Sequence, residues 1–402
     1  MTTLAPDRSA RSTAGLKVID VDTHLSEPED LWTRRAPAKY RDRVPQIGMV
    51  GGQVSWVIDG NLPIGIGAGA SSIFHRDGRR GVGVEGWSSW RVGDVIPACS
   101  EAAARVAMMD EAGIHAQIVY PNVIGFGGQN TAHVDPELRL VSTQIYNDAM
   151  VELQEASGQR LFPMATLPWW DVREAVKETR RAHGDGLKGI NINSDPHRHN
   201  DADGTPLPDL SQDYWNPLWE VCEELDMPIN FHIGASEQSM DWVGKAGWPA
   251  LSINHRSALA GSMLFIDNGR VIGNIIYSGL LDRFPKLKFV SVESGIGWVP
   301  FILESIDYQF QSLITKSNLQ HRPSDYFRRN FYACFWFEKR DLSHVIEQVG
   351  IDNCMFETDF PHIVCLHPAP LDYMEDGLAT LDDASRAKVM SGNAARVYNI
   401  AL

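Results

Sequence analysis

Residues 16–25 read LKVIDVDTHL, and residues 354–362, near the other end of the chain, read CMFETDFPH. Each stretch is a short apolar run of the kind that forms a buried strand, and each ends in carboxylate and imidazole side chains. Asp22 and His24 stand two residues apart, so on an extended strand both side chains leave the same face and can converge on one ion. Ligand-type residues at two strand ends near opposite termini indicate a closed barrel, in which the first and last strands are neighbours.

Between these two stretches, a unit of apolar strand, polar strand end and amphipathic helix repeats along the chain. The intervening strands are predicted in HAQIVYPN, RLFPMATLPW, LKGININ, MPINFHIG, LKFVSVESG and FYACFWFE. Eight such units in order predict an α/β protein with a (β/α)8 TIM barrel. A doubly wound open sheet would normally carry a glycine-rich phosphate turn after its first strand, where this chain has DTHLSEP.

A small β-hairpin is predicted after the first strand, where residues 48–67 read GMVGGQVSWVIDGNLPIGIG. The alternation and the Asp-Gly turn are typical of two antiparallel strands. We expect this hairpin and the irregular stretch that follows it to form an insertion over about residues 35–98, packed over the barrel mouth. Residues 1–15 are predicted to be a disordered leader, and residues 16–402 a single barrel domain.

The composition excludes several classes of partner. The chain has 36 Lys and Arg against 51 Asp and Glu, a formal charge of -15, which argues against binding nucleic acid or an anionic membrane surface. It has no signal-peptide core, no apolar run of membrane-spanning length, and five scattered cysteines typical of reduced thiols, so we expect a cytoplasmic protein. The expected partners are a small-molecule substrate and, because of the aromatic-rich insertion, further copies in a homodimer or larger assembly.

The barrel hypothesis nominates site residues, because the active site of such a fold lies at the carboxyl ends of its strands. Predicted strands one, five and eight end in Asp22, His24, His232 and Asp359. Two imidazoles and two carboxylates can together hold Zn, Mn or Fe, and the oxygen-rich balance leans towards Mn or Fe. Simpler roles exist as well: Asp22 could cap the segment that follows, and His24 could pack in the core.

Other residues near the predicted mouth could act on a substrate. Glu293, after strand six, could shuttle a proton from metal-activated water, or it could cap the next helix. His362 could contact substrate or support a metal ligand, and Asn191 at the end of strand four could contact substrate. Trp298 is a candidate pocket wall, and His255 could reach over the mouth from the long connection after strand five. For these two residues, plain packing and surface capping are the simpler roles.

Four stretches carry a family resemblance: DTH followed by EPEDLW, then NFHIG, then RFPKLKFVSVESGIGWVPF, and finally ETDFPH. With them the chain resembles, from about Lys17 to Tyr398, the amidohydrolase-related family that includes the aminocarboxymuconate-semialdehyde and resorcylate decarboxylases. The resemblance implies a metal held by a first-strand pair, a fifth-strand histidine and an eighth-strand aspartate. These positions correspond to the same four residues, Asp22, His24, His232 and Asp359.

Two departures from the family pattern bear on the chemistry. The usual first-strand pair is His-x-His or Glu-x-His, whereas this chain has Asp22, which leaves the identity of the metal open. The decarboxylases of the family place a histidine after strand six, where this chain has Glu293. A carboxylate at that position favours activation of water over decarboxylation.

We therefore expect a metal-dependent hydrolase of a small aromatic or heterocyclic substrate, which cleaves a C–N bond with loss of an amine or nitro group. Two alternatives stay open on the same barrel. One is a non-oxidative decarboxylase of an aromatic or muconate acid. The other is a dinuclear Fe or Mn/Fe monooxygenase, in which Glu293, His255 or His362 completes a second metal site. The expected cofactor is thus one divalent ion (Zn, Mn or Fe), or two; a catalytically silent subunit would bind none tightly.

Overall fold

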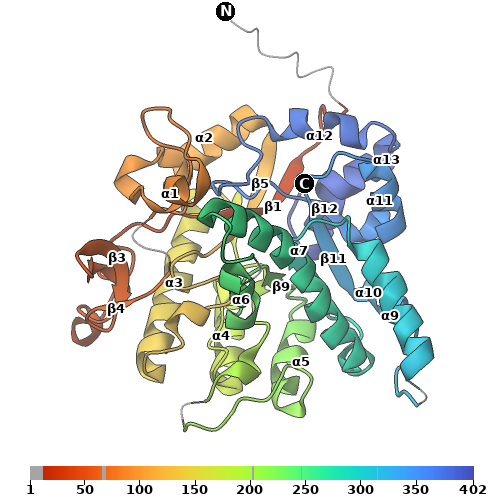
Figure 1. Cartoon of the computed structure of the whole chain (residues 1–402), viewed down its shortest axis with the longest axis horizontal. Helices are drawn as coiled ribbons and strands as arrows, with labels where there is room; N and C mark the ends of the chain where they lie inside the picture. Colours follow the sequence, from red (N-terminus) through yellow and green to blue (C-terminus); the bar gives the residue numbers. More distant parts are fainter. Residues whose placement is uncertain (1–11, 66–68, 202, 246, 315) are drawn as a thin grey trace, which may run out of the picture.

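The computed structural model describes residues 12–65, 69–201, 203–245, 247–314 and 316–402 (Figure 1). Its parallel strands are β1 (Val18–His24), β5 (Ile114–Tyr120), β6 (Leu161–Pro163), β7 (Ala165–Thr166), β8 (Ile190–Asn191), β9 (Ile229–His232), β10 (Phe289–Val292), β11 (Phe331–Phe335) and β12 (Cys354–Phe356). Hydrogen bonding orders them as β1-β5-β6 and as β7-β8-β9-β10-β11-β12. β6 and β7 are two parts of the third strand, since the Met164 N–H between them donates to Val119 O over 3.0 Å.

Backbone hydrogen bonds between the two ends of the chain close the barrel. The Asp359 N–H donates to Asp22 O over 2.9 Å, and the His24 N–H donates to Phe360 O over 2.7 Å. Thr23 and Phe360 form a parallel bridge. The first strand and the segment after the eighth are therefore neighbours, and the predicted (β/α)8 barrel is confirmed.

Strand side chains alternate between the barrel interior and the surrounding helices. In β10, Val290 and Val292 belong to the apolar cluster inside the barrel, whereas Phe289 packs with the helices. The C-terminal segment contributes Tyr398 to the interior cluster. The helices are α1 (Gly83–Ser88), α2 (Ala102–Ala112), α3 (Pro136–Ala156), α4 (Val172–Gly184), α5 (Asn216–Glu224), α6 (Glu237–Lys245), α7 (Ile253–Tyr277), α8 (Leu280–Arg283), α9 (Val299–Leu313), α10 (Pro323–Asn330), α11 (Leu342–Val349), α12 (Pro370–Leu378), α13 (Asp383–Ala387) and α14 (Asn393–Val397).

The predicted hairpin after the first strand is present, with a third short strand. β2 (Gln46–Val50), β3 (Gln53–Ile58) and β4 (Leu62–Pro63) form an antiparallel sheet beside the barrel (Figure 1). Gly51 and Gly52 join the first two strands with φ of 56° and 84°, the positive values that a two-residue hairpin turn requires. This β2–β4 insertion returns the chain to the barrel mouth.

The predicted leader falls largely outside the described residues, which begin at position 12. Residues 13–15 lie in a turn, and the Ser12 N–H donates to Glu375 Oε1 over 2.8 Å. Among the helices that the structure describes, none is both long and apolar enough to cross a membrane.

Candidate metal centre

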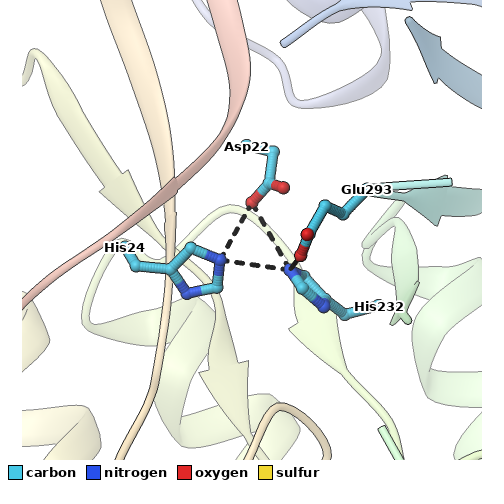
Figure 2. Close-up of side chains that lie close together, drawn as sticks. All are labelled: Asp22, His24, His232 and Glu293. Carbon is cyan, nitrogen blue, oxygen red and sulfur yellow. Dashed lines mark hydrogen bonds and ion pairs between the residues drawn. The ribbon is translucent and has the colours of Figure 1, made fainter. Parts of the chain in front are cut away.

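Six ionisable side chains meet inside the mouth of the barrel, and all six are buried. Their ligand atoms form two overlapping groups, each within 4.8 Å: Asp22, His24, His232 and Glu293, and then His24, Glu293, Asp359 and His362. Figure 2 shows the first group, with side chains from β1, β9 and the end of β10 pointing toward one another. All four residues predicted as metal ligands therefore lie in one cluster, together with Glu293 and His362.

A β-bulge in β1 aims Asp22 into the barrel. The pairing of β1 with β5 shifts register between Asp20 and Thr23, so β1 carries an extra residue there. Before the bulge, Ile19 and Val21 face the barrel interior and Asp20 faces the opposite side. Strict alternation would place Asp22 on the same side as Asp20, away from the interior. The extra residue turns Asp22 and His24 together toward the cluster, a known use of bulges beside active sites.

Left-handed backbone positions Glu293 and Asp359 at the ends of their strands. Their φ values are 54° and 58°, a region that residues other than glycine rarely adopt. Such a conformation costs of order 1–3 kcal/mol and persists where the surrounding structure fixes it, often at functional sites. Glu293 Oε2 thereby lies 3.3 Å from His232 Nε2, and Asp359 Oδ1 lies 3.6 Å from His24 Nε2.

The two histidines predicted as ligands, His24 and His232, each present Nε2 to the centre of the cluster. Nδ1 of His24 lies 3.3 Å from Pro121 O, and Nδ1 of His232 lies 2.8 Å from Ile233 O. A carbonyl oxygen only accepts, so both Nδ1 atoms carry the hydrogen and donate it. The two Nε2 atoms are then free to bind an ion, and they lie 3.2 Å apart.

The distances in the cluster fit one divalent ion. Ligands bound to a single ion at about 2.0–2.2 Å lie roughly 3–3.6 Å from one another. Asp22 Oδ1 is 3.5 Å from His24 Nε2 and 3.6 Å from His232 Nε2. Both carboxylate oxygens of Asp22, and Oδ2 of Asp359, are buried without a hydrogen-bond partner. Buried carboxylate oxygens that lack donors need a cation, which this donor set is suited to hold.

Charge interactions in the cluster also favour a bound cation. Burial raises the pKa of Asp359 well above its usual range, and Asp22 adds to the shift. Burial and Asp359 likewise raise the pKa of Glu293. Burial acts to lower the pKa of His232, but Asp22 and Glu293 outweigh it and raise that pKa. The cluster thus crowds negative charge that a metal cation would neutralise.

His362 is held against the cluster by Asn122, a residue that the sequence analysis missed. Asn122 Nδ2 donates to Leu25 O over 2.8 Å, so its Oδ1 faces Nε2 of His362, 2.9 Å away, and accepts that N–H. Nδ1 of His362 then faces Asp359 Oδ1 at 2.8 Å. Its ring stacks on that of His24 with 3.8 Å between centroids. Burial lowers the pKa of His362 to about 3.

A buried arginine supports the backbone of His24, one of the predicted ligands. The guanidinium of Arg105 in α2 is 2% exposed and donates to His24 O over 2.7 Å, and also to the carbonyls of Ala98 and Cys99. It therefore ties the end of β1 to the end of the insertion. The sequence around Arg105 reads as an ordinary amphipathic helix and does not predict this role.

The remaining predicted site residues lie in different places. Asn191 is buried on β8, and because Ile190 and Ile192 pack with the helices its side chain points into the barrel. Neither of its side-chain polar atoms has a hydrogen-bond partner. Trp298 is a correction: its Nε1 donates to Ser294 O, and its ring packs against α7.

His255 is a second correction. It lies exposed in the first turn of α7, where its Nδ1 is 2.7 Å from Ser252 Oγ. The structure does not bring it into the six-residue cluster. The connection after β9 includes the long helix α7, and His255 lies at its solvent-exposed start. Closeness to His232 in the sequence therefore does not bring His255 to the cluster.

A pocket opens beside the cluster at the barrel mouth. It has a volume of about 380 Å³, and its wall includes Asn122 and Phe126 from the loop after β5. The Phe126 ring lies 4.2 Å from that of His232 and 5.1 Å from that of His24, measured between centroids. A larger cavity of about 570 Å³ beside Arg270 includes none of the cluster residues in its wall. The wall of the smaller pocket does not include a cluster residue either, but it adjoins the cluster through Asn122 and Phe126.

A parallel barrel with imidazoles and carboxylates gathered at its strand ends is the architecture of a metal-binding barrel enzyme. The chain belongs to the amidohydrolase family, whose model matches residues 19–400. It is thus an enzyme of the amidohydrolase superfamily, as the sequence motifs predicted.

Solved structures with the same fold include three that are informative. An amidohydrolase from Mycobacterium avium subsp. paratuberculosis is 23% identical, with a TM-score of 0.75, covering 96% of this chain and 99% of its own. A dihydroxybenzoic acid decarboxylase from Polaromonas sp., solved with manganese and the inhibitor 2-nitroresorcinol, is 21% identical, with a TM-score of 0.59 and coverages of 96% and 97%. A 5-carboxyvanillate decarboxylase from Sphingomonas paucimobilis is 26% identical, with a TM-score of 0.60 and coverages of 76% and 85%.

Proposed function

We propose that this enzyme is a metal-dependent decarboxylase that removes the carboxylate of a small aromatic acid without oxidation. The observation that carries the proposal is a ligand set with single-ion distances beside a small pocket, in a chain 26% identical to a 5-carboxyvanillate decarboxylase over 76% of its length. This was the first alternative to the hydrolase that the sequence favoured. Manganese is the proposed ion, because the oxygen-rich donor set suits it and the dihydroxybenzoic acid decarboxylase was solved with it.

Asp22, His24, His232 and Asp359 would hold the ion. When bound, a divalent cation supplies a Lewis acid that binds the substrate carboxylate and withdraws electron density from it. We propose one ion rather than two, because the two ligand groups of the cluster share His24 and Glu293 and so surround the same point. Asn191, buried with free amide atoms, would orient a polar group of the substrate.

The reaction needs a proton donor at the ring carbon. The bond between that carbon and the carboxylate carbon breaks, CO2 leaves, and the electron pair that stays on the ring takes up a proton. Glu293 would supply it, since it lies in the cluster and its burial favours the protonated carboxyl. Solvent would then return a proton to Glu293, and no water is consumed overall.

Hydrolysis of a C–N bond is the second candidate, favoured by the carboxylate at position 293. In that reaction Glu293 would take a proton from water as the oxygen adds to the substrate and then deliver it to the leaving group. The two reactions share the site residues but differ in their products. The oxygenase alternative would in addition require dioxygen and a reductant.

An isotope experiment tests the proposal. Manganese-loaded enzyme is incubated with hydroxybenzoic acids carrying a 13C carboxylate, and with aryl amines and nitroarenes, in 18O-labelled water. The decarboxylase predicts labelled CO2, no 18O in the ring product, and no dioxygen uptake. Labelled oxygen in the product of an amine or nitroarene, with no CO2 from any acid, would refute the decarboxylase and support the hydrolase.

Glu293→Gln should slow the release of CO2 by roughly 100-fold or more, because the amide cannot donate the proton in the same way. His255→Gln is the matched control and should retain the wild-type rate, since His255 lies outside the cluster. A Glu293→Gln enzyme with the wild-type rate would remove Glu293 from the proposed mechanism.

A further inference from the structure

Two long helices, α7 and α9, pack against each other on the outside of the barrel (Figure 1). Gly269 of α7 allows the close approach, because a Cβ there would lie 3.1 Å from the Trp298 ring and 3.4 Å from Ile302. Nearer the C-terminal end of α7, the Tyr277 hydroxyl donates to Ile306 O of α9 over 2.7 Å. The outward sides of the two helices therefore form one continuous surface.

Large apolar side chains follow the outward side of both helices. Leu259 and Ile266 in α7 are about two helical turns apart, and Tyr277 follows after about three more turns, so all three lie on one line. Phe301 and Tyr308 in α9 are likewise about two turns apart. Phe301 is 72% exposed and Tyr308 67%, and the three residues of α7 are 38% to 43% exposed. These five side chains define the α7–α9 face.

The two helices present little charge to solvent. Across the 25 residues of α7 and the 15 of α9, all of which the structure describes, the charged residues are Arg256, Asp267, Arg270, Glu304 and Asp307. Asp267 and Asp307 are buried, and Arg256 is partly buried. The guanidinium of Arg270 is paired with the carboxylates of Asp195 and Asp267. Glu304 is thus the one exposed charged residue in these helices, although 22% of the whole chain is charged.

A second copy of this chain is the partner that suits such a face. The chain carries a formal charge of -15, so two copies repel each other wherever their carboxylates come together. On the α7–α9 face, two copies can meet without opposing like charges. A different protein would be expected to recognise so acidic a chain through basic groups opposite its carboxylates, and this face offers few of them. Interface cores are poor in charge and rich in aromatic residues, as this face is.

The apolar area of the face is sufficient for a stable contact. At ~200 Å² for each large side chain when fully exposed, the five residues expose about 500 Å². A standard interface covers ~800 Å² on each partner, of which about 57%, or ~450 Å², is non-polar. We propose that the α7–α9 face joins two copies of this chain in a homodimer, with the same residues on both sides of a two-fold axis. This inference does not depend on the proposed reaction.

The proposed contact lies away from the insertion, where the sequence led us to expect one. Trp56 in β3 of the insertion is only 3% exposed, and its ring packs against that of Trp32 in the core. Its aromatic surface is therefore used within the chain. Met49 in β2 is 54% exposed, so the insertion still provides an apolar site with which the two locations can be compared.

Sedimentation velocity tests the interface with variants that introduce charge. The wild type is expected to sediment at twice the chain mass at about 10 µM, as a Kd of about 1 µM or tighter requires. Ile266→Glu and Phe301→Glu each place carboxylates on both sides of the contact and should weaken the dimer at least about 100-fold. Met49→Glu is the matched control and should leave the dimer intact. Circular dichroism should show the wild-type helix content in all three, because each replaced residue is exposed.

Several outcomes would overturn the inference. One is a wild-type protein that stays monomeric at about 100 µM, even if another protein binds the face. Another is a dimer that survives in either folded α7–α9 variant, or that Met49→Glu dissociates as readily. Raising NaCl from about 0.05 M to 0.5 M should leave the dimer at least as tight, because salt screens the repulsion between two acidic copies. Dissociation in salt would indicate a contact built on ion pairs and would also overturn the assignment.

Discussion

Gly127 lies where the loop after β5 crosses the ends of two neighbouring strands, next to Phe126. A Cβ at this position would fall on the carbonyl oxygen of Ala235 and lie 2.9 Å from Ile192 O. It would also lie 2.9 Å from the Cα of Asn193. All three are backbone atoms, which cannot rotate aside as a side chain can. Gly127→Ala must therefore displace the loop or the strand ends.

The expected cost follows from overpacking, which typically destabilises by about 1–3 kcal/mol. Unfolding entropy is about 2.1 cal/mol/K per residue, or roughly 0.8 kcal/mol/K for 402 residues. The Tm of Gly127→Ala should accordingly fall by about 1–4 °C. Because Phe126 moves with the loop, substrate affinity should fall as well, and a misplacement of about 1 Å can cost up to about 100-fold in rate.

Thermal denaturation followed by circular dichroism measures the first effect, and calorimetric titration with a hydroxybenzoic acid measures the second. Gly261→Ala is the matched control, because Gly261 is in α7 and its Cβ would meet nothing within 4 Å. Alanine should stabilise that helix by up to about 1 kcal/mol, the opposite sign. A Gly127→Ala protein with unchanged Tm and affinity would refute the close packing of this loop.

Three further outcomes are expected. Manganese at about 100 times its Kd should stabilise the protein by about 2.7 kcal/mol, or roughly 3 °C in a thermal shift assay, and a chelator should reverse this. Burial raises the pKa of Glu27 from 4.5 to about 7, so the folded state binds a proton that the unfolded state has lost. The free energy of unfolding, measured by denaturant titration, should therefore decrease as pH rises across that window. In Glu27→Gln this decrease should be smaller by roughly 1–3 kcal/mol, because the amide does not titrate. Arg105→Met should weaken manganese binding about 10–100-fold in titrations followed by electron paramagnetic resonance, because His24 O loses its donor, and Arg105→Lys should weaken it less.

The barrel and the clustering of the four candidate ligands were predictable because strand ends are visible in the sequence. Apolar runs of β-branched and aromatic residues mark the strands, and a parallel barrel collects their carboxyl ends on one face. Asp22, His24, His232 and Asp359 all stand at such ends, and the structure places them in one cluster. Local pattern and topology were sufficient for this part of the site.

Features that depend on backbone geometry or long-range contact were not predictable in the same way. The bulge that turns Asp22 inward is a register shift between two strands, and it leaves no mark on the residues themselves. Asn122 and Phe126 act through contacts with residues far along the chain. The glycine-rich run around Phe126 was a usable signal, since Gly127 has no space for a Cβ.

His255 and Trp298 illustrate the converse error. Both were nominated from residue type and from a connection near the predicted mouth. The structure gives His255 a solvated helix start and Trp298 a packing position against α7. Residue chemistry without a strand end to place it is a weak guide to a barrel site.

Metal content per chain is the measurement that tests the account most directly. Protein produced with manganese, and purified without chelator, is assayed by elemental analysis as wild type, Asp22→Asn, His232→Gln and His255→Gln. About one ion per chain is expected in the wild type and the His255 variant, and little in the Asp22 and His232 variants, because one ion suffices for Lewis acid chemistry. Ligand variants that retain the wild-type content would contradict the metal centre, and two ions per chain would contradict its single-ion assignment.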